Sequence, residues 1–180
     1  MGSRSQGSAD RFGEEFKLPH RHGSYEALLA DKGVEAVYIS TPHPMHAEWA
    51  IKAAEAGKHI LCEKPRARAL ADADAMIAAS RKVGVRLMIG HSRRATRRYM
   101  EVRQAIDRGE LGEVRLLREN ERRMRLPLGQ RGKYWSPGHW TANPEVSAGA
   151  VLTNAIHEMD LLRWFAGAPP VTVFAEHKIT

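Results

Sequence analysis

Three short apolar runs divide the first half of the chain at nearly regular intervals. They are "VEAVYIST" (34–41), "KHILCEK" (58–64) and "VRLMIGHS" (85–92), each with the apolar and β-branched residues that strands favour. Helical patterns separate them. The order strand, helix, strand, helix, strand predicts right-handed crossovers in a parallel sheet. Since helices normally cover both faces of such a sheet, we expect strands that are buried on both sides.

Two helices are predicted between these strands by small and apolar residues at helical spacing. The first helix ends at Gly57 and the second at Gly84, because glycine commonly ends a helix. The residues expected on the buried faces are Ala47, Ala50, Ile51 and Ala54 in the first helix, and Leu70, Ala73 and Ile77 in the second. Two further helical segments, 9–16 and 24–31, precede the first strand.

The pattern changes after Ser92. A basic amphipathic helix is predicted to end at Gly109, and "GEVRLLRENERRM" (112–124) predicts a strand of a different sheet. A helix follows over 151–167, and the alternating run 170–180 predicts another strand. We therefore expect two domains, 1–92 and 93–180, the first built on the parallel sheet and the second a different α/β arrangement.

Composition excludes several classes of protein. The 180 residues include a single cysteine, Cys62, so neither an internal disulfide framework nor a cysteine metal cage is expected. No apolar run reaches the roughly 18 residues of a membrane span, and the first residues show no apolar signal segment, which favours a soluble, cytoplasmic protein without a membrane partner. No metal is predicted, because metal-ligand spacing such as H-E-x-x-H is not found around the histidines at 20, 22, 59, 91, 139 and 177.

The net charge of +7 raises the question of nucleic-acid binding, but the excess is local. Residues 93–133 carry 13 Arg or Lys against 6 Asp or Glu. Such a cluster is either a phosphate-binding surface or the solvated face of an amphipathic helix. Neither zinc-finger spacing nor an RNA-binding aromatic motif accompanies it. We favour the solvated face and expect no nucleic-acid partner.

Candidate chemistry gathers at the ends of the predicted strands, because open parallel sheets bind ligands beyond the carboxyl ends of their strands. These ends are "STPHPMH" (40–46), "EKP" (63–65) and "GHSRR" (90–94). Pro65 would end its strand and keep Lys64 extended. Together with "GELGEV" (109–114) and "AIHEMDLLRW" (155–164), the segment 34–65 resembles the Gfo/Idh/MocA family of nicotinamide-dependent oxidoreductases.

The resemblance implies an incomplete Rossmann-type parallel-sheet domain followed by the beginning of an α/β C-terminal domain. It also implies hydride transfer between NAD or NADP and a hydroxyl or carbonyl carbon of a small-molecule substrate, namely a sugar, polyol or related cyclic compound. The parent protein would be a homo-oligomer that associates through its C-terminal sheet. A non-catalytic relative that senses nucleotides or binds proteins is the alternative.

Two catalytic residues follow from the resemblance. Lys64 matches the lysine that lies near the nicotinamide and the substrate hydroxyl, with a typically cis Lys-Pro peptide, and His157 matches the active-site histidine of an H-x-x-D helix. A lysine exchanges protons near neutral pH if burial or a nearby positive charge lowers its pKa, and an imidazole titrates there naturally. The alternatives are a surface lysine paired with Glu63 and a helix histidine paired with Asp160.

The resemblance also suggests binding residues. Those expected to contact the cofactor are Arg4, Thr41, Pro42, His43, His46, Glu63, Lys64 and Pro65. Those expected to contact the substrate are Arg94, Thr153, Asn154 and His157. Thr153 stands where many polyol-oxidising members carry an aspartate, which puts a proton relay through that position in doubt.

One family motif is not found in the sequence. A Rossmann domain opens on a G-x-G-x-x-G turn whose following helix holds the pyrophosphate, and no such turn occurs in these 180 residues. The resemblance places residues 3–12 just after the family's second strand, with Arg4 where some members bind the 2′-phosphate of NADP. We therefore expect the first βαβ unit to be missing and the chain to be a fragment with weak or no activity.

Overall fold

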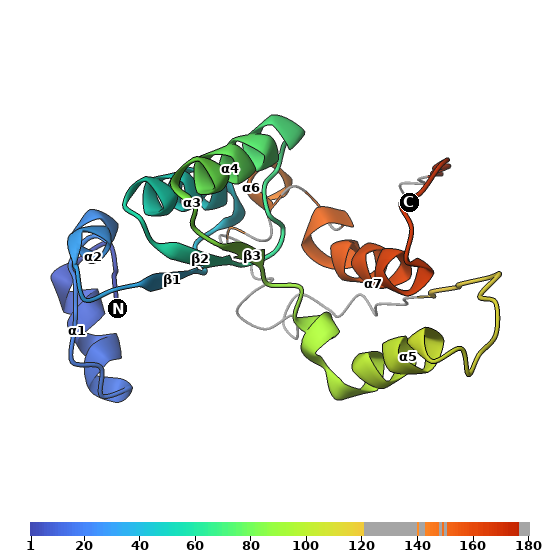
Figure 1. Ribbon diagram of the computed structural model, residues 1–180. Coiled ribbons are helices and arrows are strands. Elements are labelled where there is room, and N and C mark those ends of the chain that lie inside the picture. The colour runs from blue at the N-terminus through green and yellow to red at the C-terminus, as the bar shows by residue number, and fades with distance from the viewer. Residues whose placement is uncertain (121–139, 141–142, 148, 150, 177–180) are drawn as a thin grey trace, which may run out of the picture. The chain divides into compact units, whose positions relative to one another are not determined.

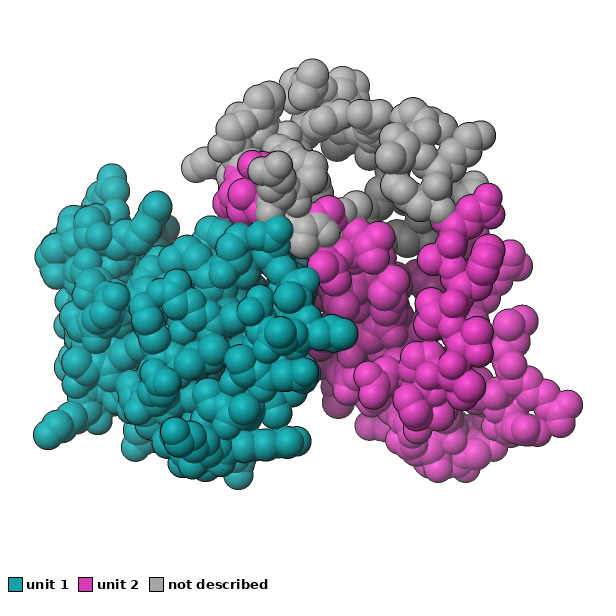
Figure 2. All heavy atoms as spheres, turned by 90° about the horizontal axis from the view of Figure 1, so that it is seen from above, with its two compact units in different colours: residues 1–90 teal, residues 91–180 magenta. Residues whose placement is uncertain are grey.

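The computed structural model describes residues 1–120, 140, 143–147, 149 and 151–176 (Figure 1). The chain forms two units, Met1–Gly90 and His91–Thr180 (Figure 2). The first contains a parallel sheet and its helices. The second is helical in its described parts.

The sheet of the first unit has three parallel strands, as predicted. The strands β1 (Ala36–Ile39), β2 (His59–Cys62) and β3 (Leu87–Ile89) lie in the order β1-β2-β3. Helix α3 (His46–Glu55) connects the first two strands and α4 (Leu70–Val83) the last two (Figure 1). Ile39 pairs with Cys62 and Cys62 with Ile89, so all three strands end together at one edge of the sheet.

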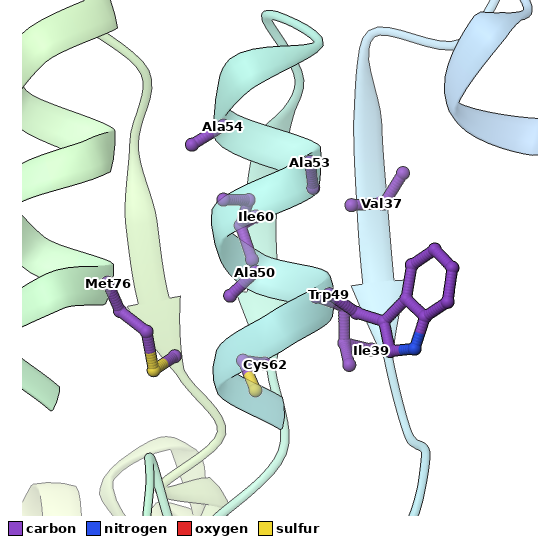
Figure 3. Packing of buried hydrophobic residues seen from close by; sticks show 9 residues of the cluster. All are labelled: Val37, Ile39, Trp49, Ala50, Ala53, Ala54, Ile60, Cys62 and Met76. Carbon is purple, nitrogen blue, oxygen red and sulfur yellow. The ribbon is translucent and has the colours of Figure 1, made fainter. Parts of the chain in front are cut away.

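The core lies between the sheet and these two helices (Figure 3). Val37 and Ile39 of β1 and Ile60 and Cys62 of β2 point toward the helices. The small residues Ala50, Ala53 and Ala54 of α3, with Met76 of α4, cover them. Alanine side chains allow a helix to approach a sheet closely, which is why this face is buried. Burial and the nearby charge of Glu63 raise the pKa of Cys62 to about 12, which makes the thiol unreactive in the folded chain.

The opposite face of the sheet corrects one prediction. Tyr38, Leu61 and Met88 are in register across the three strands and are 58%, 38% and 67% exposed, respectively. Coverage of both faces is therefore wrong for the described residues. The strand order runs in one direction, β1-β2-β3, and α3 and α4 both lie on the other face of the sheet (Figure 1).

The buried stripe of α4 also differs from the prediction. Of the three predicted residues, Ala73 and Ile77 are partly buried but Leu70 is 86% exposed, whereas Met76 and Ser80 are buried. At 3.6 residues per turn, the stripe centred on Met76 and Ser80 is rotated by about 90° from Leu70. The predicted Ala face of α3 is confirmed, with Ala50 and Ala54 buried and Ala47 and Ile51 partly buried.

Two short helices precede the sheet. Helix α1 spans Gln6–Glu15 and α2 spans Tyr25–Ala30. The side chain of Ser24 accepts a hydrogen bond from the Ala27 amide at 3.0 Å, a typical N-cap. An isolated parallel bridge joins Gly2 to His22, which fixes the chain just before Arg4.

The second unit begins with a 3-10 turn, η2 (Ser92–Ala95), and α5 (Arg97–Asp107). Helix α6 (Pro144–Ser147) and a π-helical turn, η6 (Val151–Ala155), lead into α7 (Ile156–Ala166). The predicted helix over 151–167 thus starts with a π turn. In α5, Arg97 pairs with Glu101 at 2.7 Å, so part of the arginine excess is neutralised along the helix.

The two strands predicted for the second unit are wrong in their described parts. Residues 114–120 and 172–176 have no strand pairing, and Leu116, Val171 and Phe174 are exposed. Residues 121–124 and 177–180 of these predictions lie outside the described residues. An alternating sequence becomes a strand only where another strand supplies its hydrogen bonds. Of the helices that the structure describes, none combines the length and hydropathy needed to span a bilayer.

Candidate active site

The carboxyl ends of the three strands are tied together by backbone hydrogen bonds. The Glu63 amide donates to the Ile39 carbonyl at 2.9 Å, and the Gly90 amide donates to the Cys62 carbonyl at 2.7 Å. The segments after the strands therefore start from fixed positions. The first of the predicted ligand-binding ends continues through η1 (His43–Met45) directly into α3.

Glu63 organises the turn after β2. Its Oε1 accepts a hydrogen bond from the Tyr38 hydroxyl at 2.7 Å, and its Oε2 accepts one from the Lys64 amide at 3.2 Å. A Cβ at Gly90 would lie only 3.3 Å from Oε1, so the small residue at 90 leaves room for the carboxylate. Glu63, which was expected to contact a cofactor, binds the Tyr38 hydroxyl and the backbone of Lys64 in this structure. Tyr38 was not predicted, and its only sequence signal is its place two residues before Ser40 at the strand end.

The Tyr38–Glu63 contact gives a pH prediction. The hydrogen bond to Glu63 and burial raise the pKa of Tyr38 to about 12 from 10.0. Near pH 11, Tyr38 should remain protonated in the wild type and become largely ionised in Glu63→Gln, since that change removes the neighbouring negative charge. Carbon-13 NMR of ring-labelled tyrosine measures this, with Tyr38→Phe assigning the signal. An unchanged titration in Glu63→Gln would show that the carboxylate does not control the phenol.

Lys64 is half-buried and Pro65 is buried in this turn. The Lys64–Pro65 peptide is cis, as the family resemblance implied. The Pro65 carbonyl oxygen lies 2.8 Å from Nδ1 of His46 at the start of α3. Hydrogen bonds therefore hold the backbone on both sides of the lysine side chain, at the Lys64 amide through Glu63 and at the Pro65 carbonyl through His46.

His46 lies inside the unit and is 0% exposed. Its Nε2 lies 2.9 Å from the Thr41 carbonyl oxygen, so one imidazole bridges the ends of β1 and β2. His43 is buried too, and its ring centroid lies 5.6 Å from that of His46. His46 was expected to contact a cofactor, but both of its ring nitrogens face backbone carbonyls.

Thr41 offers a group that suits a ligand. Its Oγ1 is buried, and among the residues that the structure describes no atom hydrogen-bonds it. Buried hydroxyls almost always have a partner, so an unpaired one at the end of a strand fits a site that a ligand completes. Pro42 follows it and is half-buried. Arg4 is exposed and lies just before α1.

The second unit contains a separate cluster around the first turns of α7. The Arg94 guanidinium donates to both carboxylate oxygens of Asp160, at 2.7 and 2.6 Å, and Arg93 pairs with Glu158. His91 Nδ1 lies 3.7 Å from Asp160 Oδ2. The expected substrate residue Arg94 is therefore bound to Asp160, an ion pair that raises the pKa of Arg94.

His157 lies in the first turn of α7, one residue before Glu158 and three before Asp160. Its ring faces that of His91 edge-on, with centroids 6.4 Å apart at 86°, and its Nδ1 is buried. Neither His91 nor Glu158 was predicted; the only sequence signal for them is proximity to "GHSRR" and to the H-x-x-D pattern. The arginine pairs fix α7 to the segment at 91–94, and with it the position of His157 within this unit.

The other two expected substrate residues lie in the π turn before α7. Thr153 is buried, and its hydroxyl donates to the Ser147 carbonyl at 2.9 Å. Asn154 is half-buried. The π-helical turn is the kind of helix irregularity that often occurs at functional sites. In the described parts of the chain, His, Cys, Asp and Glu form no group suited to holding a metal ion.

The structure thus gathers the predicted residues into two groups. Thr41, His46, Glu63, Lys64 and Pro65 share the strand ends of the first unit, and Arg94 and His157 share the α7 cluster of the second. Lys64 and His157 belong to different units, and their roles as catalytic residues stay predictions.

Comparison with known proteins covers both halves of the chain. A model described as "Oxidoreductase family, NAD-binding Rossmann fold" matches residues 1–91, and one described as "GFO/IDH/MocA C-terminal domain" matches residues 99–180. A 1,5-anhydro-D-fructose reductase of Ensifer adhaerens is 36% identical over 158 residues, 84% of this chain and 44% of the relative. A myo-inositol 2-dehydrogenase of Thermotoga maritima is 32% identical over 164 residues, 91% of this chain and 44% of the relative.

Solved structures show the same likeness. Levoglucosan dehydrogenase in complex with NADH and levoglucosan superimposes with a TM-score of 0.76 at 27% identity, over 91% of this chain and 43% of that protein. The chain spans less than half the length of each of these three proteins.

Proposed function

The chain belongs to the Gfo/Idh/MocA family of oxidoreductases, and we propose that it supplies the proton-transferring and substrate-binding residues of a site for hydride transfer. The hydride would move between NAD or NADP and a hydroxyl or carbonyl carbon. The observation that supports this most is the position of Lys64. It lies at the carboxyl end of a central parallel strand, where such sheets bind ligands, in a turn that Glu63 and His46 hold on either side.

Lys64 would handle the proton of the reaction. Oxidation of an alcohol carbon leaves an oxygen that must release its proton, and reduction must supply one. A half-buried ammonium at a fixed position can do this once a positive charge beside it lowers its proton affinity. NAD(P) would supply that charge and the hydride acceptor. The buried hydroxyl of Thr41 fits hydrogen bonding to the cofactor, with Pro42 beside it.

The second unit would bind the substrate. His157 supplies an imidazole that can hydrogen-bond a hydroxyl or exchange a proton, and Asn154 can bind a further hydroxyl. The Thr153 hydroxyl already donates to Ser147, so it fits a role in shaping the turn rather than in proton transfer. The proton chemistry of this chain would therefore depend on Lys64 and His157.

The substrate class follows from what the relatives share. Their names refer to anhydrofructose, myo-inositol and levoglucosan, all cyclic compounds with several hydroxyl groups. We infer that this chain acts on a cyclic sugar, polyol or related compound, recognised through ring hydroxyls by His157 and Asn154.

Cofactor titration tests the proposal. NADH and NADPH are added separately to the purified chain while reduced-nicotinamide fluorescence is followed, and the oxidation of a panel of cyclic polyols is then measured with NAD or NADP. Weak but saturable binding and slow turnover of one substrate are expected, because these 180 residues contain no G-x-G-x-x-G phosphate-binding turn. Binding without turnover would favour a non-catalytic nucleotide sensor, and no binding of either cofactor would contradict the proposal for this chain.

A further inference from the structure

Both ring nitrogens of His46 lie within 3 Å of a backbone carbonyl oxygen, Pro65 O at 2.8 Å from Nδ1 and Thr41 O at 2.9 Å from Nε2. A carbonyl oxygen accepts hydrogen bonds and cannot donate them. A neutral imidazole has one N–H and one lone pair, so it satisfies only one of these contacts. The other contact would place two lone pairs against each other.

From this geometry we propose that His46 is held in the folded chain as a doubly protonated imidazolium, a positioning residue that clamps the end of β1 to the Lys64–Pro65 turn. Only the imidazolium has a donor on each nitrogen. Charge-assisted hydrogen bonds are also stronger than neutral ones.

The burial of His46 makes its protonation state matter. The ring is 0% exposed, so water cannot replace a missing hydrogen bond. A buried cation requires compensation, and the two carbonyl dipoles supply it from opposite ends of the ring. The titratable residues on the elements that the ring joins are His43 of η1, Glu63 and Lys64 beside Pro65, and Glu48, Lys52 and Glu55 of α3. Glu48 and Lys52 pair with each other.

The clamp that His46 forms acts on two residues of the proposed site, Thr41 and Lys64. Thr41 contributes its carbonyl to His46 and leaves its hydroxyl for a ligand, while Pro65 fixes the residue after Lys64. Loss of one ring proton would break one of the two hydrogen bonds and so release either the end of β1 or the Lys64–Pro65 turn. This consequence rests on the proposed function: His46→Gln is expected to weaken NADH binding by about tenfold, the effect of losing one charge-assisted hydrogen bond.

The proton count can be measured without cofactor. The full chain is labelled with nitrogen-15 histidine, and long-range nitrogen–proton correlation spectra are recorded between about pH 6 and pH 8.5, a range that brackets the ordinary histidine value. At pH 7.5 or so, both ring nitrogens of His46 are expected to carry slowly exchanging protons. Through-bond correlation from the His46 backbone assigns the signals, so no variant has to fold.

His59 serves as the matched control in the same spectrum. Its Nδ1 accepts a hydrogen bond from the Arg86 amide at 3.0 Å, so this nitrogen should carry no proton at that pH. One proton on His46 and a lone pair on its other nitrogen would overturn the proposal. Two protons on His46 with no NADH binding would uphold the clamp and contradict the proposed function instead.

Discussion

Replacement of Lys64 by methionine is expected to lower NAD(P)-dependent oxidation of a cyclic polyol by about 100-fold or more, the usual contribution of a positioned acid or base. Methionine keeps the length of the side chain and removes its proton-exchanging group. The backbone contacts of the turn, from Glu63 to the Lys64 amide and from Pro65 to His46, do not involve the lysine side chain. Cofactor affinity should therefore change much less than the rate.

The measurement is the rate of NADH or NADPH formation at saturating substrate, alongside the fluorescence titration of the same preparation. Lys82→Met is the matched control, because Lys82 is an exposed lysine on α4 in the same unit. It should retain the wild-type rate. If Lys64→Met retained it as well, Lys64 would have no part in proton transfer.

Replacement of Met76 by alanine is expected to lower the free energy of unfolding of the first unit by about 2–4 kcal/mol, since it removes a large buried side chain and leaves a cavity. Met76 is 0% exposed and packs from α4 onto the sheet (Figure 3). The loss of unfolding free energy is measured from the rate at which a thiol reagent modifies Cys62 at increasing urea concentrations. This thiol is the only one in the chain and is buried in the same core, so it reacts when that core opens.

Met88→Ala provides the comparison, because it changes the same residue type in the same unit at a site that is 67% exposed. A surface substitution of this kind should stay within about 0.5 kcal/mol of the wild type. Equal losses in the two variants would mean that the first unit does not unfold from the core that Figure 3 shows.

Much of the first unit could be predicted because its signals are local. Apolar runs of strand length, helical spacing of alanines and the glycines at 57 and 84 depend only on neighbours in the chain, and the structure has those elements. The strand ends could be located for the same reason, and with them Lys64. The prediction failed for residues 114–120 and 172–176, where an alternating pattern needs a second strand that the sequence pattern does not specify.

The roles of side chains within the site required the fold. "STPHPMH" places His46 at the start of a helix, but only the packing of α3 against the β2 turn puts both of its nitrogens against carbonyls. Arg94 follows a strand end, yet its pairing with Asp160 joins residues that are 66 positions apart. Sequence by itself determined the order of elements in the first unit and its parallel sheet, because both depend on short-range periodicity, and its motifs carried the resemblance to the family. Tertiary structure decided which sheet face is covered, which polar groups are already bonded and which buried hydroxyl has no hydrogen-bond partner among the described residues, because hydrogen bonds and burial depend on groups that meet only when the chain folds.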